Sequence, residues 1–301
     1  MLTNQLRLDA VDHVTAITAD GQRCLDFYAG VLGLAFVGGA PDFEAPDSHL
    51  LSFAPEAGRP RGVLSFIEAP GLGRGQAGAG MAHTVAWRLP TAAAVPYWAA
   101  RLAEAGIHAE PLDGERSGPG VRFADPEGLT HELIAGGSGP DAPLGPTPSA
   151  VPPEHAIGEL VGVRAYGRER IPSADILAGR LGFEVTGRDA YEVSGAGRST
   201  AFVFDEPPGA LGVLGAGAIH HVAWAGEGSL SAWRQRVIGM GCRATPVIDR
   251  GHCLSIYFRE PSGVLFEIAA RDSAKTRDPR DADLPRRLSP TVDPRVRSAL
   301  V

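Results

Sequence analysis

The chain repeats one short pattern four times, and this repeat restricts its fold more than any other feature. Each copy starts with a brief apolar strand that has histidine or glycine at its centre. These strands are Val11–Thr15, Met81–Val85, Leu160–Arg164 and Ile219–Ala223. A stretch with apolar residues at helical spacing follows each strand and ends near a glycine, as at Gly33 and Gly106. Each copy is therefore predicted to begin as a strand followed by a helix.

Three more short strands are predicted after each helix. In the second copy they are Ala109–Pro111, Val121–Ala124 and Thr130–Ile134, and in the fourth they are Ala244–Ile248, Leu254–Phe258 and Val264–Ile268. In both copies the turn before the last strand has proline two residues ahead of glycine (Asp125–Gly128 and Glu260–Gly263), which is typical of a tight hairpin. The sequence thus predicts an α+β fold of four βαβββ modules that pair into two open, barrel-like halves.

The chain is expected to divide at a segment rich in glycine and proline that lacks any apolar period. We expect an N-terminal pair of modules at residues 1–136 and this linker at residues 137–156. A C-terminal pair of modules is expected at residues 157–272, followed by a charged tail at residues 273–301.

Composition excludes several classes of partner. The formal net charge is −7 at pH 7 and no basic stripe is present, which argues against nucleic acid and anionic membrane surfaces. No run approaches 18 apolar residues and the N-terminus lacks a signal-peptide core, so a soluble, cytoplasmic protein is expected. Three cysteines without CxxC spacing argue against disulfides or a thiolate zinc site. Base rates for oligomers favour a homodimer.

Five polar residues interrupt the apolar strand pattern: His13, His83, His221, Glu132 and Glu267. A carboxylate buried on a strand such as Val264–Ile268 is costly unless it meets a cation. The separations 267 − 221 = 46 and 132 − 83 = 49 are similar, so both pairs hold equivalent positions in their modules. Paired modules would direct these side chains into a shared trough.

We predict that His13, His221 and Glu267 bind one divalent metal ion. A lone strand histidine is more often structural, but His221 has Glu267 in register within the repeat. Two imidazoles and one carboxylate on one face of a metal leave open coordination positions, as in non-haem Fe(II) oxygenases, and also suit Mn(II), zinc or nickel. A second metal-binding triad of His83, Glu132 and His13 is an alternative that the sequence leaves open. The other histidines, namely His49, His108, His131, His155 and His252, are expected on the surface or in hairpins.

The repeat over residues 8 to 271 resembles the vicinal oxygen chelate superfamily, with its glyoxalase-like fold. Three stretches, Gly217–Trp224, Thr245–Arg250 and Ser255–Ala269 (SIYFREPSGVLFEIA), resemble hydroquinone-type ring-cleaving dioxygenases, including 2,6-dichlorohydroquinone dioxygenase. Residues Asp283–Leu288 resemble the closing segment of that group. The resemblance implies Fe(II) held by His13, His221 and Glu267, with a small aromatic diol and O₂ as substrates.

The resemblance also implies further catalytic residues: Asp12, Thr15, His220, Arg250 and Tyr257. His220 is expected to act as acid and base, and Arg250 and Tyr257 are expected to hydrogen-bond the substrate. The family usually has histidine where this chain has Asp12, so Asp12 either replaces that base or caps the strand.

The predicted function is an Fe(II)-dependent extradiol-type dioxygenase that cleaves a substituted hydroquinone, with Mn(II) as the second choice of metal. Three alternatives use the same fold. They are a catechol-type extradiol dioxygenase, a glyoxalase-like metal-dependent lyase or isomerase, and a non-catalytic small-molecule-binding or resistance protein. A buried triad argues against the last alternative, because an apolar binding trough has no use for it.

Overall fold

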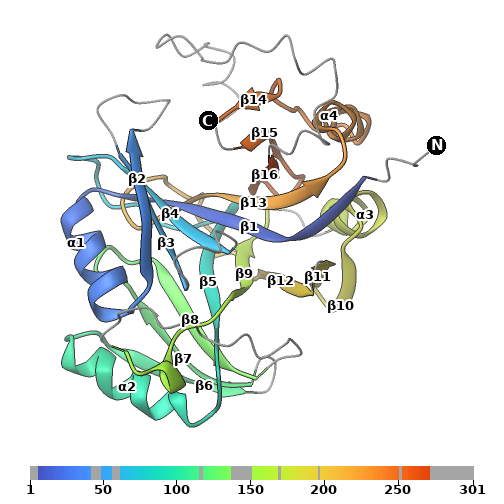
Figure 1. The fold of residues 1–301 in the computed structure, drawn as a ribbon. Coiled ribbons are helices and arrows are strands. Elements are labelled where there is room, and N and C mark those ends of the chain that lie inside the picture. The colour runs from blue at the N-terminus through green and yellow to red at the C-terminus, as the bar shows by residue number, and fades with distance from the viewer. Residues whose placement is uncertain are drawn as a thin grey trace.

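The computed structural model describes residues 6–41, 49–55, 62–114, 118–136, 151–168, 171–195, 197–250 and 253–271 (Figure 1). Within these ranges each module contains a strand, a helix and three further strands, in that order. The predicted α+β fold of four βαβββ modules is therefore confirmed.

The first module comprises β1 (Arg7–Thr18), α1 (Gly21–Leu25) with a π-helical continuation (Asp26–Val31), β2 (Ala35–Pro41), β3 (His49–Ala54) and β4 (Val63–Glu68). The second comprises β5 (Met81–Leu89), α2 (Ala94–Glu104), β6 (Ala109–Gly114), β7 (Gly118–Ala124) and β8 (Thr130–Ala135). After a 3₁₀ turn (Pro153–His155), the third comprises β9 (Leu160–Tyr166), α3 (Ile171–Ile176) with a π-helical continuation (Leu177–Leu181), β10 (Glu184–Gly187), β11 (Ala190–Gly195) and β12 (Arg198–Asp205). The fourth comprises β13 (Ile219–Glu227), α4 (Leu230–Gly239), β14 (Ile248–Asp249), β15 (Cys253–Arg259) and β16 (Leu265–Arg271).

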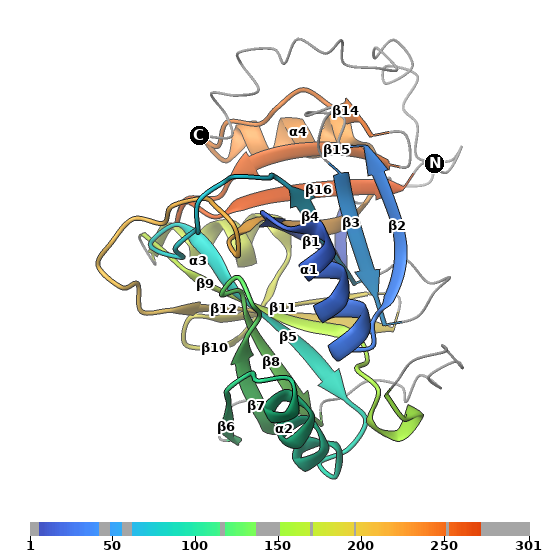
Figure 2. The same cartoon turned by 90° about the vertical axis from the view of Figure 1, so that its left-hand side faces the viewer.

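The helices form where the apolar spacing predicted them, and they pack against the sheets (Figure 2). α4 begins after Ser229, whose Oγ accepts a hydrogen bond from the Ala232 N–H, and it buries Trp233. It ends just before Gly241, whose φ of +84° is a left-handed conformation that favours glycine. α2 packs on β6, β7 and β8, and α4 packs on β15 and β16.

The strands form two eight-stranded sheets. The first has the order β14-β15-β16-β13-β1-β4-β3-β2, and the second has the order β10-β11-β12-β9-β5-β8-β7-β6. In the first sheet β1 pairs antiparallel with β13, and in the second β5 pairs antiparallel with β9. One continuous sheet therefore joins the first module to the fourth, and the other joins the second to the third.

In both sheets, this pairing joins modules that lie on opposite sides of the predicted linker. A segment rich in glycine and proline marks a break in regular structure, but it carries no information about which strand edges hydrogen-bond. The boundaries at residues 1–136, 137–156 and 157–272 stay predictions of domain organisation. Residues 137–150 and the tail at 273–301, including Asp283–Leu288, lie outside the described residues.

The fourth module also departs from its predicted strands. Residues Ala244–Ile248 were expected to form a strand, but only Ile248–Asp249 does so, beside an isolated bridge between Ala244 and Phe258. Pro246 stands between these contacts. Because proline has no N–H to donate, it interrupts the ladder at this point.

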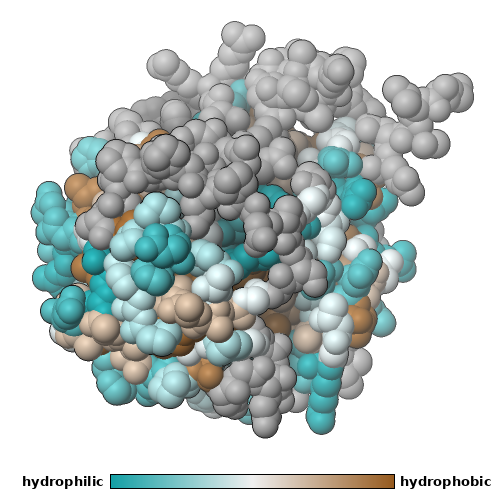
Figure 3. Space-filling view, turned by 60° about the horizontal axis from the view of Figure 1, so that its bottom comes forward, coloured by the Kyte–Doolittle hydropathy of each residue, from teal (hydrophilic) through white to brown (hydrophobic). Residues whose placement is uncertain are grey.

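One apolar core runs through both sheets and includes four fully buried tryptophans: Trp87, Trp98, Trp224 and Trp233. On the face that Figure 3 shows, hydrophobic residues of the described chain lie scattered among hydrophilic ones. No helix in the described ranges has both the length and the apolar character needed to cross a membrane. The three cysteines are free thiols, as predicted.

Candidate metal centre

Three neighbouring strands of the first sheet bring His13, His221 and Glu267 together. The sheet order β16-β13-β1 places His13, Ala223 and Glu267 in one row across the strands. Side chains in one row share a face of the sheet, and His221 reaches the same face because it lies two residues before Ala223. Ala223 carries only a methyl group, so its neighbours on either side can approach each other over it.

The ligand atoms of these residues converge. His221 Nε2 lies 2.9 Å from Glu267 Oε2, and His13 Nε2 lies 3.3 Å from the same oxygen. The two Nε2 atoms are 3.4 Å apart. Glu267 is 1% exposed and His221 is 6% exposed, whereas His13 is partly open to solvent. The predicted convergence of these three side chains is thus observed.

The glutamate has one oxygen that the described chain leaves without a hydrogen bond. Glu267 Oε1 accepts from Ser255 Oγ at 2.5 Å, but the buried Oε2 has no hydrogen-bond partner of suitable geometry among the described residues. Leaving a buried charged acceptor unsatisfied is costly. A divalent cation at the point where the three atoms meet would satisfy it.

The separations also fit one ion. Two nitrogens at about 2.1 Å from a single metal, in adjacent coordination positions, lie roughly 3.0–3.4 Å apart. The observed separation of the imidazole nitrogens (3.4 Å) and that between His13 Nε2 and Glu267 Oε2 (3.3 Å) fall in that range, and the separation of 2.9 Å between His221 Nε2 and Glu267 Oε2 lies just below it. The three residues could therefore hold a metal ion, and this geometry does not select which metal.

The electrostatics of the cluster favour one positive charge beside the carboxylate of Glu267. Burial alone would lower the pKa of His13, but the carboxylates of Glu267 and Asp12 raise it to about 10. Burial alone would raise the pKa of Glu267, but His13 and His221 hold it well below its usual range. Burial lowers the pKa of His221. A proton on His13 therefore balances the carboxylate, and a divalent cation would compete with that proton for the same atoms.

Two β-bulges aim a second polar side chain at each histidine ligand. In β1 the pairing advances from Val11 to His13 while β13 advances by one residue, which makes Asp12 the extra residue. In β13 the extra residue is His220. A bulge breaks the strict alternation of side chains, so consecutive residues can reach the same site.

Both extra residues contact the far nitrogen of the imidazole beside them. Asp12 Oδ1 lies 3.1 Å from His13 Nδ1, and His220 Nδ1 lies 2.8 Å from His221 Nδ1. Partners of this kind fix the ring orientation and the tautomer of a metal-binding histidine. Asp12 was expected either to act as a base or to cap the strand, and neither expectation included its contact with His13. Burial, followed by the charge of His221, lowers the pKa of His220 to about 3.

Of the other residues expected at the site, Thr15 and Tyr257 lie on the first sheet, and Arg250 directly follows its edge strand β14. Arg250 Nη2 donates to Tyr257 Oη at 3.2 Å, and the ring of Tyr257 packs edge-on against His221 with centroids 5.3 Å apart. Burial and the neighbouring Glu267 raise the pKa of Tyr257 well above its usual value, so it stays a neutral phenol. Thr15 is buried, with its Cα opposite that of His221.

Ser255 is the residue at this site that the sequence analysis missed. It lies on β15 at 0% exposure and donates to Glu267. Residues Cys253, Ser255 and Tyr257 alternate along one strand, so their side chains share a face. That alternation was the available signal, because Ser255 lies two residues before Tyr257 and its side chain therefore points to the same face of the strand.

His83 and Glu132 do not join this cluster. They lie on β5 and β8 of the second sheet, where His83 Nε2 is 3.0 Å from Asp205 and Glu132 Oε1 accepts from Arg122. The second triad with His13 is therefore not formed. The third module contributes no imidazole at its equivalent position, Gly162.

One of the remaining histidines was assigned wrongly. His131 was expected on the surface or in a hairpin, but it is 0% exposed. Trp87 Nε1 donates to its Nδ1 at 3.2 Å, and its Nε2 lies 2.8 Å from Tyr28 Oη. These partners are 44 and 103 residues away, so no local pattern could have indicated them. His252 lies outside the described residues.

Comparison with known proteins identifies the family of the chain. Residues 10–133 match the model of the Glyoxalase/Bleomycin resistance protein/Dioxygenase superfamily. The "Putative ring-cleaving dioxygenase MhqO" of Bacillus subtilis (strain 168) is 32% identical over 267 residues, covering 86% of this chain and 83% of the relative. A crystal structure described as a "putative dioxygenase" from the same species matches with a TM-score of 0.79 and 29% identity, over 89% of this chain and 86% of that one. Glyoxalase I from Zea mays matches with a TM-score of 0.64 and 15% identity, over 88% of this chain and 92% of that one, which is a likeness of fold alone.

Proposed function

Because the chain belongs to the glyoxalase/bleomycin resistance protein/dioxygenase superfamily, we propose that it is an Fe(II)-dependent extradiol-type dioxygenase that cleaves a substituted hydroquinone with O₂. The observation that carries the proposal is the meeting of two imidazole nitrogens and one unsatisfied, buried carboxylate oxygen. The ring-cleaving class is supported by the relatives that cover most of the chain. The choice of hydroquinone rests on the resemblance of residues Ser255–Ala269.

His13, His221 and Glu267 would hold the metal. When bound, Fe(II) supplies a Lewis acid that acidifies a phenol and a redox-active centre that can react with O₂. Three protein ligands would leave coordination positions for both substrates. Asp12 and His220 orient the two imidazoles through their Nδ1 atoms, and Ser255 orients the carboxylate through Oε1.

Tyr257 and Arg250 would position the substrate. Arg250 Nη2 donates to Tyr257 Oη, so the tyrosine can donate its own O–H proton, which lies within reach of Glu267, to a substrate oxygen instead. Because the pKa of Tyr257 is raised, its proton stays on Oη while charge develops on the ring. A fixed donor in a buried site stabilises such charge efficiently.

His220 would hold His221 in place. If His221 binds metal through Nε2, its Nδ1 carries a proton, and His220 Nδ1 is the acceptor that lies 2.8 Å away. The acid–base role expected for His220 stays a prediction. The pH dependence of turnover in His220→Gln separates the positioning role from the acid–base role. If His220 only positions His221, the variant should keep the pH profile of the wild-type protein.

The test is anaerobic reconstitution with Fe(II), followed by oxygen uptake against panels of hydroquinones and catechols. We expect uptake with a substituted hydroquinone at a stoichiometry of one O₂ per ring opened. Faster uptake with catechols would assign the catechol-type alternative. Turnover of methylglyoxal thiol adducts without any oxygen uptake would overturn the proposal in favour of a lyase or isomerase. Ligand binding without turnover of either kind would favour a binding protein.

Replacement of the carboxylate ligand provides the matched control. Glu267→Gln should abolish tight iron binding, because an amide oxygen carries no charge to offset the cation. Glu132→Gln changes the equivalent glutamate of the second sheet and should leave the iron content unchanged. A Glu267→Gln protein that keeps a full complement of iron and full activity would refute the assignment of this ligand.

A further inference from the structure

The second sheet contains a cavity at the positions where the first sheet has its metal ligands. By the repeat, His83 and Glu132 are equivalent to His221 and Glu267, and Gly162 is equivalent to His13. Gly162 leaves the space of one imidazole open, and Arg122 and Asp205 engage the other two residues. The result is a cavity of about 450 Å³ that is lined by residues of the second sheet.

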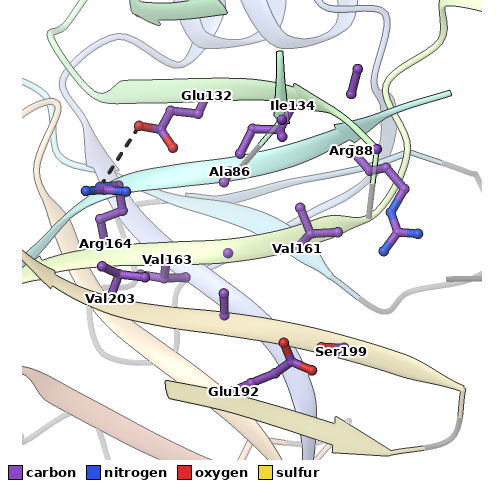
Figure 4. A pocket seen from close by; sticks show the side chains of 15 residues that line it. Ala86, Arg88, Glu132, Ile134, Val161, Val163, Arg164, Glu192, Ser199 and Val203 are labelled. Atoms are coloured by element: carbon purple, nitrogen blue, oxygen red, sulfur yellow. Dashed lines mark ion pairs between the residues drawn. The ribbon is translucent and has the colours of Figure 1, made fainter. Parts of the chain in front are cut away.

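The cavity has an apolar middle and charged ends (Figure 4). Ala86, Ile134 and Val161 line the middle, and the pair of Glu132 and Arg164 lies at one end. Arg88 lies at the other end. A cavity of about 150 Å³ already holds a benzene molecule, so this cavity has room for one substituted ring.

The arginines in and beside the cavity differ in their hydrogen-bond partners. Arg164 makes a two-bond ion pair with Asp205. Arg122, beside the cavity, makes a similar pair with Glu132. Arg88 Nε is shielded from solvent and donates to no acceptor in the described chain. The positive charge of the Arg88 side chain nevertheless lies at one end of the cavity, and a planar carboxylate is the group that matches a guanidinium best.

Charge in the rest of the lining limits the ligand to one negative group. Glu192 lines the cavity from β11, and its Oε1 accepts a hydrogen bond from Ser194 Oγ at 3.0 Å. Its carboxylate would repel a second anion on that side of the cavity. A ligand with a single carboxylate at Arg88 and an apolar body over Ala86 and Val161 meets both conditions.

We propose that this cavity is a binding site for a small monocarboxylic acid with a single-ring apolar body, and that Arg88 pairs with its carboxylate. The site is separate from the candidate metal centre, because its lining comes from the second and third modules. It does not depend on the proposed dioxygenase function.

Titration of the full-length protein with benzoate, followed by calorimetry, tests this site. We expect saturable binding with one molecule per chain. Benzamide, which has the same shape without the charge, and terephthalate, which has a second carboxylate, should both bind at least about tenfold more weakly. Equal binding of benzamide would overturn the role of the carboxylate, and equal binding of terephthalate would overturn the restriction to one charge.

Variants assign the binding to this cavity. Arg88→Gln should weaken benzoate binding by about tenfold or more, whereas Arg188→Gln, at an arginine that is 90% exposed, should leave it unchanged. Gly162→Val, which fills the middle of the cavity without altering charge, should abolish binding; thermal unfolding verifies that both cavity variants are folded. Binding that survives both changes and is lost in Glu267→Gln would place the acid at the metal centre and refute the proposal.

Discussion

The hydrogen bond from Ser255 to Glu267 gives a sharp prediction about the metal centre. The bond is 2.5 Å long, and its two residues are 0% and 1% exposed. It fixes Oε1 and thereby turns Oε2 toward the two imidazoles. In Ser255→Ala the carboxylate is free to rotate, so metal binding has to restore the orientation that the serine supplied.

The size of the effect follows from the type of bond. A hydrogen bond to a buried charged group contributes about 1.5–3 kcal/mol. Since about 1.4 kcal/mol is a factor of ten in an equilibrium constant, the Kd for Fe(II) should rise by roughly 10- to 100-fold. Partners of metal ligands have effects of about this size. Competition with a chromophoric chelator under anaerobic conditions measures the Kd.

Ser173→Ala is the matched control. Ser173 is also 0% exposed, and its Oγ donates to the buried carboxylate of Glu260 at 2.7 Å, away from the metal centre. Both variants should lose comparable stability in thermal unfolding, but only Ser255→Ala should lose metal affinity. Equal metal affinity in the two variants would refute the positioning role of Ser255.

Three further predictions concern single side chains. Asp12→Asn should weaken Fe(II) binding by about tenfold in the same chelator assay, because His13 Nδ1 loses its carboxylate, and unchanged affinity would contradict that role. Tyr257→Phe should keep the metal affinity but lower oxygen uptake per bound iron by about tenfold or more, so a variant with wild-type turnover would exclude the hydroxyl as a donor. Burial lowers the pKa of His131 from 6.5 to about 3, so below pH 6.5 the unfolded chain binds a proton that the native state does not. As the pH is lowered between those two values, this group should therefore reduce the free energy of unfolding by up to about 1.4 kcal/mol per pH unit. In His131→Gln, denaturant unfolding at several pH values should show a dependence of this free energy on pH that is shallower by that amount.

The sequence predicts the local units of this fold well. Apolar spacing marks the four helices, and glycine marks their ends, because both signals depend on contacts within about ten residues. The triad could be predicted for a related reason. A histidine and a glutamate that interrupt apolar strands at equivalent points of a repeat stand out without any knowledge of the partner strand.

Other features depend on contacts that no local pattern records. The pairing of β1 with β13 is a choice between strand edges, and the linker composition does not indicate which edges meet. The bulges at Asp12 and His220 exist only relative to the opposite strand, so their contacts with the ligand histidines could not be foreseen. His131 is buried because Tyr28 and Trp87 satisfy its two nitrogens, and both lie far away along the chain.

The union of the first and last modules in one sheet has a consequence for biosynthesis. Thr15 pairs with His221, so 221 − 15 = 206 positions separate the partners along the chain. On the ribosome, β1 emerges early and has no partner along one edge until the fourth module has been made. That edge offers unpaired N–H and C=O groups to other nascent chains in the meantime. A metal ion can meet all three residues of the triad only after β16 has left the exit tunnel, because β16 supplies Glu267.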